Sequence, residues 1–175
     1  MIVAPKSKLL KQRQGDAPTI VQILPAMIRG GVERGTVEMA DAIQKHGGRA
    51  IVISRGGPMV RHLDRLGAKH YQLDVHTKNP FRWPQVRRRL KASLSRENAD
   101  LVHVRSRVPA WIALPAAAAL GVATVSTVHG RFIALSALKR IYNRKLLKTD
   151  HVIAISNYVK DLITSQYVEV KERLT

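Results

Sequence analysis

Short apolar segments alternate with longer amphipathic segments along most of the chain. Six apolar runs predict β-strands, at 19–24, 49–54, 69–75, 100–104, 122–128 and 151–156. Between them apolar residues recur at helical spacing, as at Val86, Leu90 and Leu94. This spacing, with glycine and proline at the ends, predicts helices at 32–46, 58–66, 84–98, 109–121, 135–148 and 157–167. Pro115 predicts a kink or an interruption in the helix that contains it.

The alternation of strands and helices predicts the fold class. Strand–helix units at this spacing are typical of βαβ connections and a parallel sheet. The strands are continuous apolar runs, as expected when helices cover both faces of a sheet. We therefore expect an α/β fold, a Rossmann-like parallel sheet flanked by helices. Ligands of such sheets bind at the carboxyl ends of the strands, so the loops after the strands hold the candidate site.

The length of 175 residues predicts one domain with a short appendage. Residues 1–17 are polar and basic without sustained periodicity, and we expect a flexible basic arm there. The Rossmann-like domain is predicted at 18–167. The N-terminal segment has too short an apolar stretch for a signal peptide, and no apolar run approaches the roughly 20 residues of a membrane span.

Thirty Lys and Arg residues against twelve Asp and Glu give a net charge of +18. Such a surface favours anionic partners, which include nucleic acid, acidic lipid headgroups and phosphorylated ligands. A compositional bias that serves solubility would produce the same number. The chain has no cysteine, which excludes disulfides and thiolate metal sites and permits a reducing compartment.

The loop after the first strand contains two adjacent glycines, Gly30 and Gly31, just before a predicted helix. Glycine lets a ligand approach the backbone amides, and the N-terminus of a helix suits a phosphate. The sequence matches neither the dinucleotide fingerprint nor a P-loop. A tight turn without a ligand is the alternative interpretation.

Basic and imidazole side chains follow three other strands. His103, Arg105, Ser106 and Arg107 lie at and after the fourth strand, where two arginines beside a serine could hold a phosphate or a sugar hydroxyl. Alternation along the strand would place His103 and Arg105 on one face. A strand histidine is more often structural than catalytic, so a structural role for His103 is the alternative.

His129 and Gly130 end the fifth strand, and Arg131 follows them. The glycine leaves room for a ligand beside the imidazole, which can exchange hydrogen bonds with a sugar hydroxyl near neutral pH. The alternative is a structural loop histidine, whose hydrogen bonds are made to neighbouring residues. Arg55, after the second strand, is a weaker candidate for the same cleft. We find no metal-ligand pair, no nucleophile motif and no paired carboxylates, and therefore expect no metal site.

Five segments in this order resemble the N-terminal half of GT-B glycosyltransferases of the retaining family 4 type. They are GGVE (30–33), SRGG with a following leucine–glycine stretch (54–67), ADLVHVRS (99–106), GVATVSTVHG (121–130) and DHVIAISNYV (150–159). The resemblance covers roughly 19–167. It implies a domain that mainly binds the acceptor and faces a second, donor-binding domain across a cleft.

The resemblance also implies roles for the candidate residues. Gly30 and Gly31 would lie against the donor phosphates, and Gly130 beside the donor sugar. His129, near the transferred sugar, would be the catalytic candidate. The candidates for acceptor binding are Arg55, His103, Arg105, Ser106, Arg107 and Arg131. The donor domain of the family is absent from this sequence, and 168–175 would start the linker to it. We therefore expect the 175-residue chain alone to transfer no sugar.

The resemblance implies a hexosyltransferase that moves a sugar from a nucleotide sugar to a hydroxyl of a cell-surface glycoconjugate such as lipopolysaccharide, with retention. Such enzymes need no metal or other cofactor. We expect a cytoplasmic protein, peripheral on the inner face of a membrane. Segments 82–96 and 138–148 are basic with apolar residues at intervals and could contact an anionic membrane. A solvated face is the alternative.

Two other classes of function stay open at this point. A basic Rossmann-like module without catalytic activity could bind an anionic partner. The sequence contains no recognised nucleic-acid motif, and aromatic residues make up only 5%, which disfavours nucleic acid because few stacking platforms are present. A subunit that pairs with a separate donor-domain chain is the other alternative.

Overall fold

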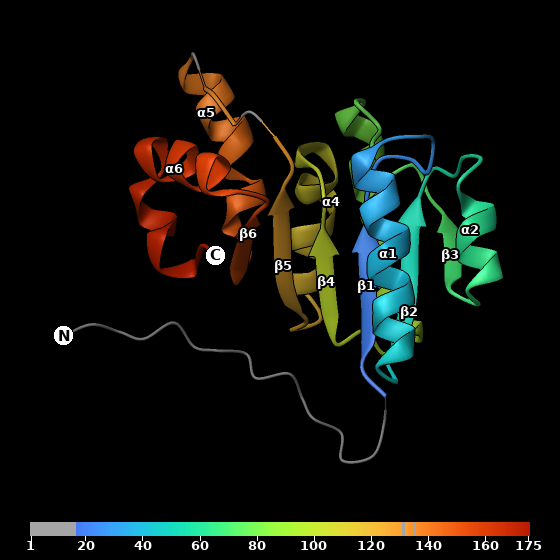
Figure 1. Ribbon diagram of the computed structural model, residues 1–175. Helices are drawn as coiled ribbons and strands as arrows, with labels where there is room; N and C mark the ends of the chain where they lie inside the picture. The colour runs from blue at the N-terminus through green and yellow to red at the C-terminus, as the bar shows by residue number, and fades with distance from the viewer. Residues whose placement is uncertain (1–16, 131, 135) are drawn as a thin grey trace.

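The computed structural model describes residues 17–130, 132–134 and 136–175, so the basic arm expected at 1–17 lies almost wholly outside the described residues. Six parallel strands form one sheet in the order β3-β2-β1-β4-β5-β6 (Figure 1). The strands are β1 (Thr19–Ile23), β2 (Arg49–Ser54), β3 (Lys69–Gln72), β4 (Leu101–Val104), β5 (Ala123–Val128) and β6 (His151–Ala154). This confirms the α/β, Rossmann-like prediction.

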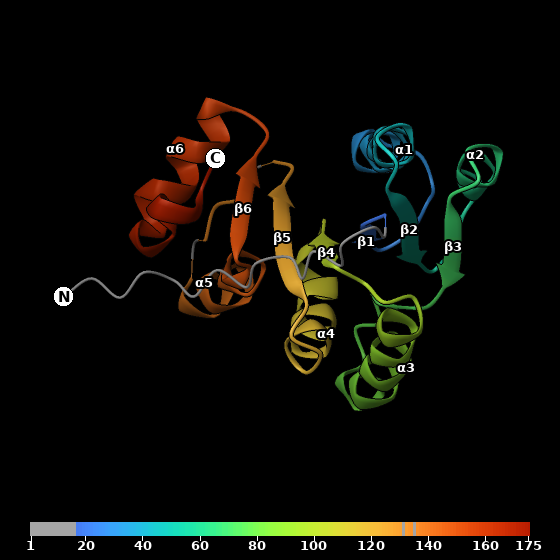
Figure 2. The same cartoon turned by 90° about the horizontal axis from the view of Figure 1, so that it is seen from below.

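Helices cover both faces of the sheet. They are α1 (Gly31–Lys45), α2 (Val60–Arg65), α3 (Trp83–Arg96), α4 (Arg107–Ala118), α5 (Ala137–Arg144) and α6 (Asn157–Gln166). Three 3₁₀ helices are η1 (Pro80–Arg82), η2 (Leu146–Lys148) and η3 (Val168–Arg173). Figure 2 shows α1, α2 and α6 on one face and α3, α4 and α5 on the other. The two helix layers bury the continuous apolar strands, as their composition predicted.

Successive residues of the central strands face opposite layers. In β2, Ile51 and Ile53 belong to the core cluster that includes α3 and α4, whereas Ala50 and Val52 belong to the cluster under α1 and α2. The apolar spacing of α3 reflects the same packing, because Val86, Leu90 and Leu94 form its buried stripe. A buried aliphatic side chain contributes roughly 1.5–3 kcal/mol, so these faces supply most of the driving force.

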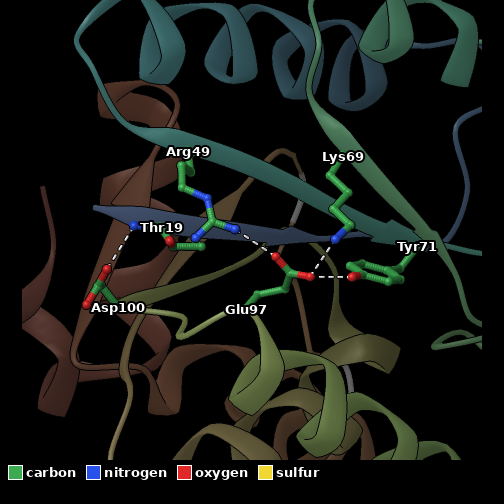
Figure 3. A network of polar contacts seen from close by, with 6 residues as sticks. All are labelled: Thr19, Arg49, Lys69, Tyr71, Glu97 and Asp100. Carbon is green, nitrogen blue, oxygen red and sulfur yellow. Dashed lines mark hydrogen bonds and ion pairs between the residues drawn. The ribbon is translucent and has the colours of Figure 1, made fainter. Parts of the chain in front are cut away.

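Glu97 organises a polar network at the amino edge of the sheet (Figure 3). Glu97 is 5% exposed, and its carboxylate accepts from Arg49 Nη2 at 2.8 Å, from Lys69 Nζ at 2.7 Å and from the Tyr71 hydroxyl. Hydrogen bonds from Lys69 and Tyr71 hold the pKa of this carboxyl below its ordinary value. The network ties the end of α3 to the first residues of β2 and β3, and so anchors the long crossover from β3 to β4.

The elements differ from the sequence prediction at several ends. α4 begins at Arg107, earlier than predicted, and runs through Pro115 without an interruption. A proline removes only one backbone donor, and Ala119 N still donates to Pro115 O at 3.2 Å. The helix predicted at 135–148 is divided into α5 and η2. β3 ends at Gln72, three residues before the predicted end.

The tail at 168–175 packs against the domain. η3 buries Val170, and Leu174 forms a parallel bridge with Val152 beside β6. Arg173 Nη1 donates to Leu147 O at 3.0 Å. These residues therefore extend the folded unit past 167, and the expectation that they start a linker to a second domain stays a prediction.

Candidate functional site

The strand order reverses between β1 and β4, since β2 and β3 lie to one side and β5 and β6 to the other. In open α/β sheets ligands bind at this switch point, beyond the carboxyl ends of the strands. A cavity of about 230 Å³ opens there and is called the switch-point cavity below. Its lining combines the first turn of α1 with the ends of β4 and β5: Val32, Arg105, Ser106, Arg107, Thr127, Val128, His129, Gly130, Phe132 and Leu146.

Arg105 lines this cavity although it is only 7% exposed. Its Nη1 donates to Gln22 Oε1 at 2.8 Å and to Gly35 O at 3.4 Å, while its Nε is buried without a partner. Burial lowers the pKa of Arg105 to about 10, so the guanidinium is still charged at pH 7. The site therefore contains a buried positive charge with incomplete hydrogen bonding.

His103 and His129 lie on the same side of the sheet as Arg105. His103 is 4% exposed, and its Nε2 shares a hydrogen bond of 2.7 Å with Thr127 Oγ1. Burial first, then the charges of Arg105 and His129, lowers the pKa of His103 to about 3. Burial first, then Arg105, lowers the pKa of His129 to about 4. Both imidazoles are therefore neutral at pH 7, and His129 Nε2 is buried without a partner.

Ser106 and Arg107 line the cavity at the start of α4. Arg107 Nη1 donates to Asn143 Oδ1 of α5 at 3.0 Å, and its guanidinium lies 5.3 Å from the centre of the Phe132 ring. Ser106 is the N-cap residue of α4, but its side chain makes no capping hydrogen bond. In α5 and α6 the capping serines, Ser136 and Ser156, do bond their helices. The positive end of α4 thus faces the cavity without a side-chain cap.

The glycine loop lies beside the switch-point cavity. Gly30 caps α1 without a side chain, and a Cβ there would meet only the Glu33 carboxylate, at 2.6 Å. A Cβ on Gly31 would meet nothing within 4 Å. The fold therefore does not require glycine at either position. Gly30 lines a second cavity, of about 630 Å³, together with Arg34 of α1 and Arg61 of α2.

The structure brings some sequence candidates together and separates others. Arg105, Ser106, Arg107, His129 and Gly130 line one cavity. His103 lies under it and reaches it through its bond to Thr127. Arg55 is exposed outside the lining of this cavity, and Arg131 lies outside the described residues. Whether any of these side chains contacts a sugar stays a prediction.

The described part of the chain contains no group of three or more metal-ligating side chains placed to hold an ion. Within the same residues, no helix has the length and apolar character that crossing a membrane requires.

Residues 29–175 match the family described as Glycosyltransferase Family 4. The chain belongs to glycosyltransferase family 4. A crystal structure of a glycosyltransferase from Rickettsia africae ESF-5 supports this, with 34% sequence identity and a TM-score of 0.80 over 91% of this chain. No sequence among the curated proteins matches it.

Two more distant structures share the GT-B fold of this family 4 chain. Anabaena HepE, in complex with UDP-glucose, is 14% identical, with a TM-score of 0.70 over 90% of this chain. The lipopolysaccharide outer core galactosyltransferase WaaB is 16% identical, with a TM-score of 0.65 over 90%. The family 4 chain spans 42% of the Rickettsia and Anabaena proteins and 44% of WaaB, so it corresponds to less than half their length. The predicted resemblance to the N-terminal half of such proteins is confirmed.

Sequence reasoning missed three polar residues of this site. Gln22 interrupts an apolar strand, which is a visible signal for a buried polar partner, here Arg105. Thr127 precedes His129 by two residues and so shares its face. Asn143 gave no signal, because only the fold brings α5 to Arg107.

Proposed function

We propose that this chain is the acceptor-side domain of a glycosyltransferase that moves a sugar from a nucleotide sugar to a hydroxyl group. The supporting observation is the position of His129. Its imidazole lines the switch-point cavity, is neutral at pH 7 and keeps Nε2 without a partner. A neutral imidazole with a vacant nitrogen is suited to exchange a hydrogen bond with a sugar hydroxyl.

The proposed reaction transfers one glycosyl group with retention. The acceptor oxygen bonds to the anomeric carbon while the bond from that carbon to the donor phosphate oxygen breaks. The electron pair of the broken bond leaves with the nucleoside diphosphate, and the hydroxyl proton passes to a diphosphate oxygen. The described residues offer positioning and electrostatic stabilisation for this step, since the lining holds two guanidinium groups and no carboxylate nucleophile.

The glycine loop supports a donor role for Gly30 and Gly31. Neither glycine is needed by the fold, and α1 starts without a side-chain cap. Free N–H groups and the positive end of the helix dipole are therefore available to a phosphate brought by a second domain. HepE, whose structure contains UDP-glucose, is a protein of the same fold.

We further propose that the face formed by α3, α4 and α5 lies against an anionic membrane, with a lipid-linked glycoconjugate such as lipopolysaccharide as acceptor. Among the exposed apolar residues, Phe81 of η1 and Leu138 and Ile141 of α5 are 91%, 80% and 59% exposed. α3, which carries exposed arginines at 87, 88 and 89, lies on the same face of the sheet as α4 and α5 (Figure 2). Apolar side chains among basic ones are typical of surfaces that bind acidic lipids.

The two basic segments of this face are joined through α4. The rings of Trp83 and Trp111 are 6.0 Å apart, and Lys145 Nζ lies 5.4 Å from the Trp111 ring. We also propose that the protein lies on the cytoplasmic side of a membrane, with this face at the membrane surface. WaaB, a lipopolysaccharide galactosyltransferase by its name, has the same fold.

The test uses the gene product as the source cell makes it, after its intact mass is measured. We expect a mass about twice that of this 19.5 kDa chain and transfer of labelled sugar from at least one nucleotide sugar. The H129A variant should lose roughly 100-fold or more in turnover, as when one hydrogen bond made in the transition state is removed, whereas H46A, at the exposed C-cap histidine of α1, should not. A mass equal to this chain, or full activity of H129A, would contradict the proposal. The 175-residue chain alone should show no turnover.

A further inference from the structure

The switch-point cavity contains positive charge that the described protein leaves without a counter-charge. Arg105 and Arg107 both line it, and neither forms an ion pair with a carboxylate of the described residues. Glu38 on α1 influences Arg105 only at longer range. A buried charge is costly unless it is paired, so such an arrangement is stabilised when an anion enters.

Unpartnered polar atoms point to the same requirement. Arg105 is 93% buried, because 7% of it is exposed, and its Nε has no partner. His129 Nε2 is also buried without a partner in the same lining. Buried polar groups are nearly always hydrogen-bonded, so two exceptions in one cavity indicate an absent ligand or water. The uncapped start of α4, with Ser106 and Arg107 in the lining, adds its positive dipole end.

The position of Arg105 is fixed by its surroundings. Gln22 holds the guanidinium by one bond and is itself held by its Nε2 bond to Thr36 O at 3.0 Å. A Cβ on Gly35 would lie only 3.1 Å from Arg105 Nη2, so α1 packs directly over the guanidinium. Arg107 is held in turn by Asn143 and Phe132. Two preorganised guanidinium groups are suited to a carboxylate or a phosphate.

We propose that the switch-point cavity binds the anionic group of an acidic acceptor, a sugar that carries a carboxylate or a phosphate. The inference rests on the proposed function, which assigns an acceptor to this domain. It adds the chemical class of that acceptor. A cavity of about 230 Å³ accommodates such a group with ordered water, since one water occupies about 30 Å³ of liquid. A neutral hydroxyl acceptor would leave the charge of Arg105 uncompensated.

Binding to the full 175-residue chain tests this without any transfer reaction. The probes are glucuronate, glucose 6-phosphate and neutral glucose, measured by calorimetry and by amide chemical shifts. We expect both anionic sugars to bind at least tenfold more tightly than glucose, with shifts at Val32, Thr127 and Gly130. Because the site is partly buried, the affinity should depend less on salt than that of a surface charge cluster.

Variants distinguish binding in the switch-point cavity from nonspecific attraction by the positive charge of the whole chain. R107Q, at the rim, should weaken the binding of both anionic sugars roughly tenfold, since bonds to charged groups are the strong ones. R88Q, an exposed arginine of α3, removes the same charge and should change nothing. R105Q should abolish binding, and R107Q keeps the test valid if the buried variant fails to fold.

Three outcomes would overturn the proposal. They are equal affinity for glucose and the anionic sugars, equal loss in R88Q and R107Q, and Arg107-dependent binding of UDP without binding of either sugar anion. The third outcome would assign the cavity to the donor diphosphate. The chain could bind the sugar anions while the full gene product shows no transfer. That result would contradict the proposed enzyme function and support the anion site, so the two failures are distinguishable.

Discussion

Replacement of Gly57 or Gly31 by alanine adds the same methyl group to two neighbouring loops, yet the structure predicts opposite effects. Gly57 has φ of 144°, a conformation that L-residues rarely adopt. Its Cβ would lie 2.3 Å from Met27 O, which already accepts from Met59 N at 2.9 Å. Gly31, in the first turn of α1, has open space around its Cβ position.

The magnitudes follow from these environments. The strained φ costs roughly 1–3 kcal/mol, and the forced overlap with backbone costs about as much again. We therefore expect G57A to lower the free energy of unfolding by roughly 3 kcal/mol or more, or the melting temperature by about 6–12 °C. G31A should raise the free energy of unfolding by up to ~1 kcal/mol, because alanine restricts the unfolded chain and favours the helix.

Urea and thermal unfolding followed by circular dichroism measure both variants. In the two-domain enzyme proposed above, G31A should also raise KM for the nucleotide sugar about tenfold, equivalent to ~1.4 kcal/mol, because the methyl group occupies the space proposed for the donor phosphate. A destabilised G31A, or a G57A as stable as the wild type, would refute the structural reasoning. An unchanged KM in G31A would refute the donor assignment alone.

Three further predictions concern charge. E97Q should lower the free energy of unfolding by roughly 1–3 kcal/mol at pH 7 in urea titrations. Since the folded pKa of Glu97 is depressed, its contribution is complete above the ordinary value of 4.5 and is lost as the pH falls through the folded pKa, so the variants should converge in acid. As the pH falls from 6.5 to about 3, the unfolded chain binds a proton at His103 that the folded chain does not bind. The free energy of unfolding of the wild type should therefore fall over this window by about 1.4 kcal/mol per pH unit. H103Q removes this titrating group and should reduce the loss of stability. Reversal of Arg87, Arg88 and Arg89 to glutamate should weaken binding to vesicles with acidic lipids in a sedimentation assay.

Matched controls make these predictions specific. D41N breaks the exposed helical pair with Lys45, at 2.6 Å, and should cost under ~0.5 kcal/mol, unlike E97Q. An E97Q effect no larger than that of D41N, a wild-type acid profile in H103Q, or unchanged vesicle binding by the triple variant would each contradict the corresponding argument.

The fold was predictable from sequence because its signals are local. Continuous apolar strands, amphipathic helices and glycine stops occur within windows of about fifteen residues, and the parallel topology follows from their alternation. Errors fell where the local signal is ambiguous. Pro115 predicted a kink or an interruption, and the interruption does not occur, because the packing of α4 outweighs one lost hydrogen bond. The tail after 167 carried no strong period, so the sequence did not indicate the packing of Val170 and Leu174.

The position of the candidate site was predictable, but the burial and hydrogen-bond partners of its side chains were not. The switch-point rule and the resemblance together selected Arg105, Arg107 and His129. Burial of the Arg105 guanidinium could not be read from the sequence, because it depends on Gln22, 83 positions away in the chain. The same holds for Glu97, whose Arg49 and Lys69 partners lie 48 and 28 positions away. Such pairings exist only once the sheet is assembled.

The paired tryptophans have a practical consequence for spectroscopy. Trp83 and Trp111 are the two tryptophans of the sequence, and both lie on the α3–α4 side. Neither belongs to the lining of the switch-point cavity. The intrinsic emission of the chain therefore originates beside the proposed lipid-facing surface. We expect a blue shift of this emission on addition of vesicles and little change on addition of sugar anions. Fluorescence of the unlabelled protein would therefore distinguish the two kinds of ligand.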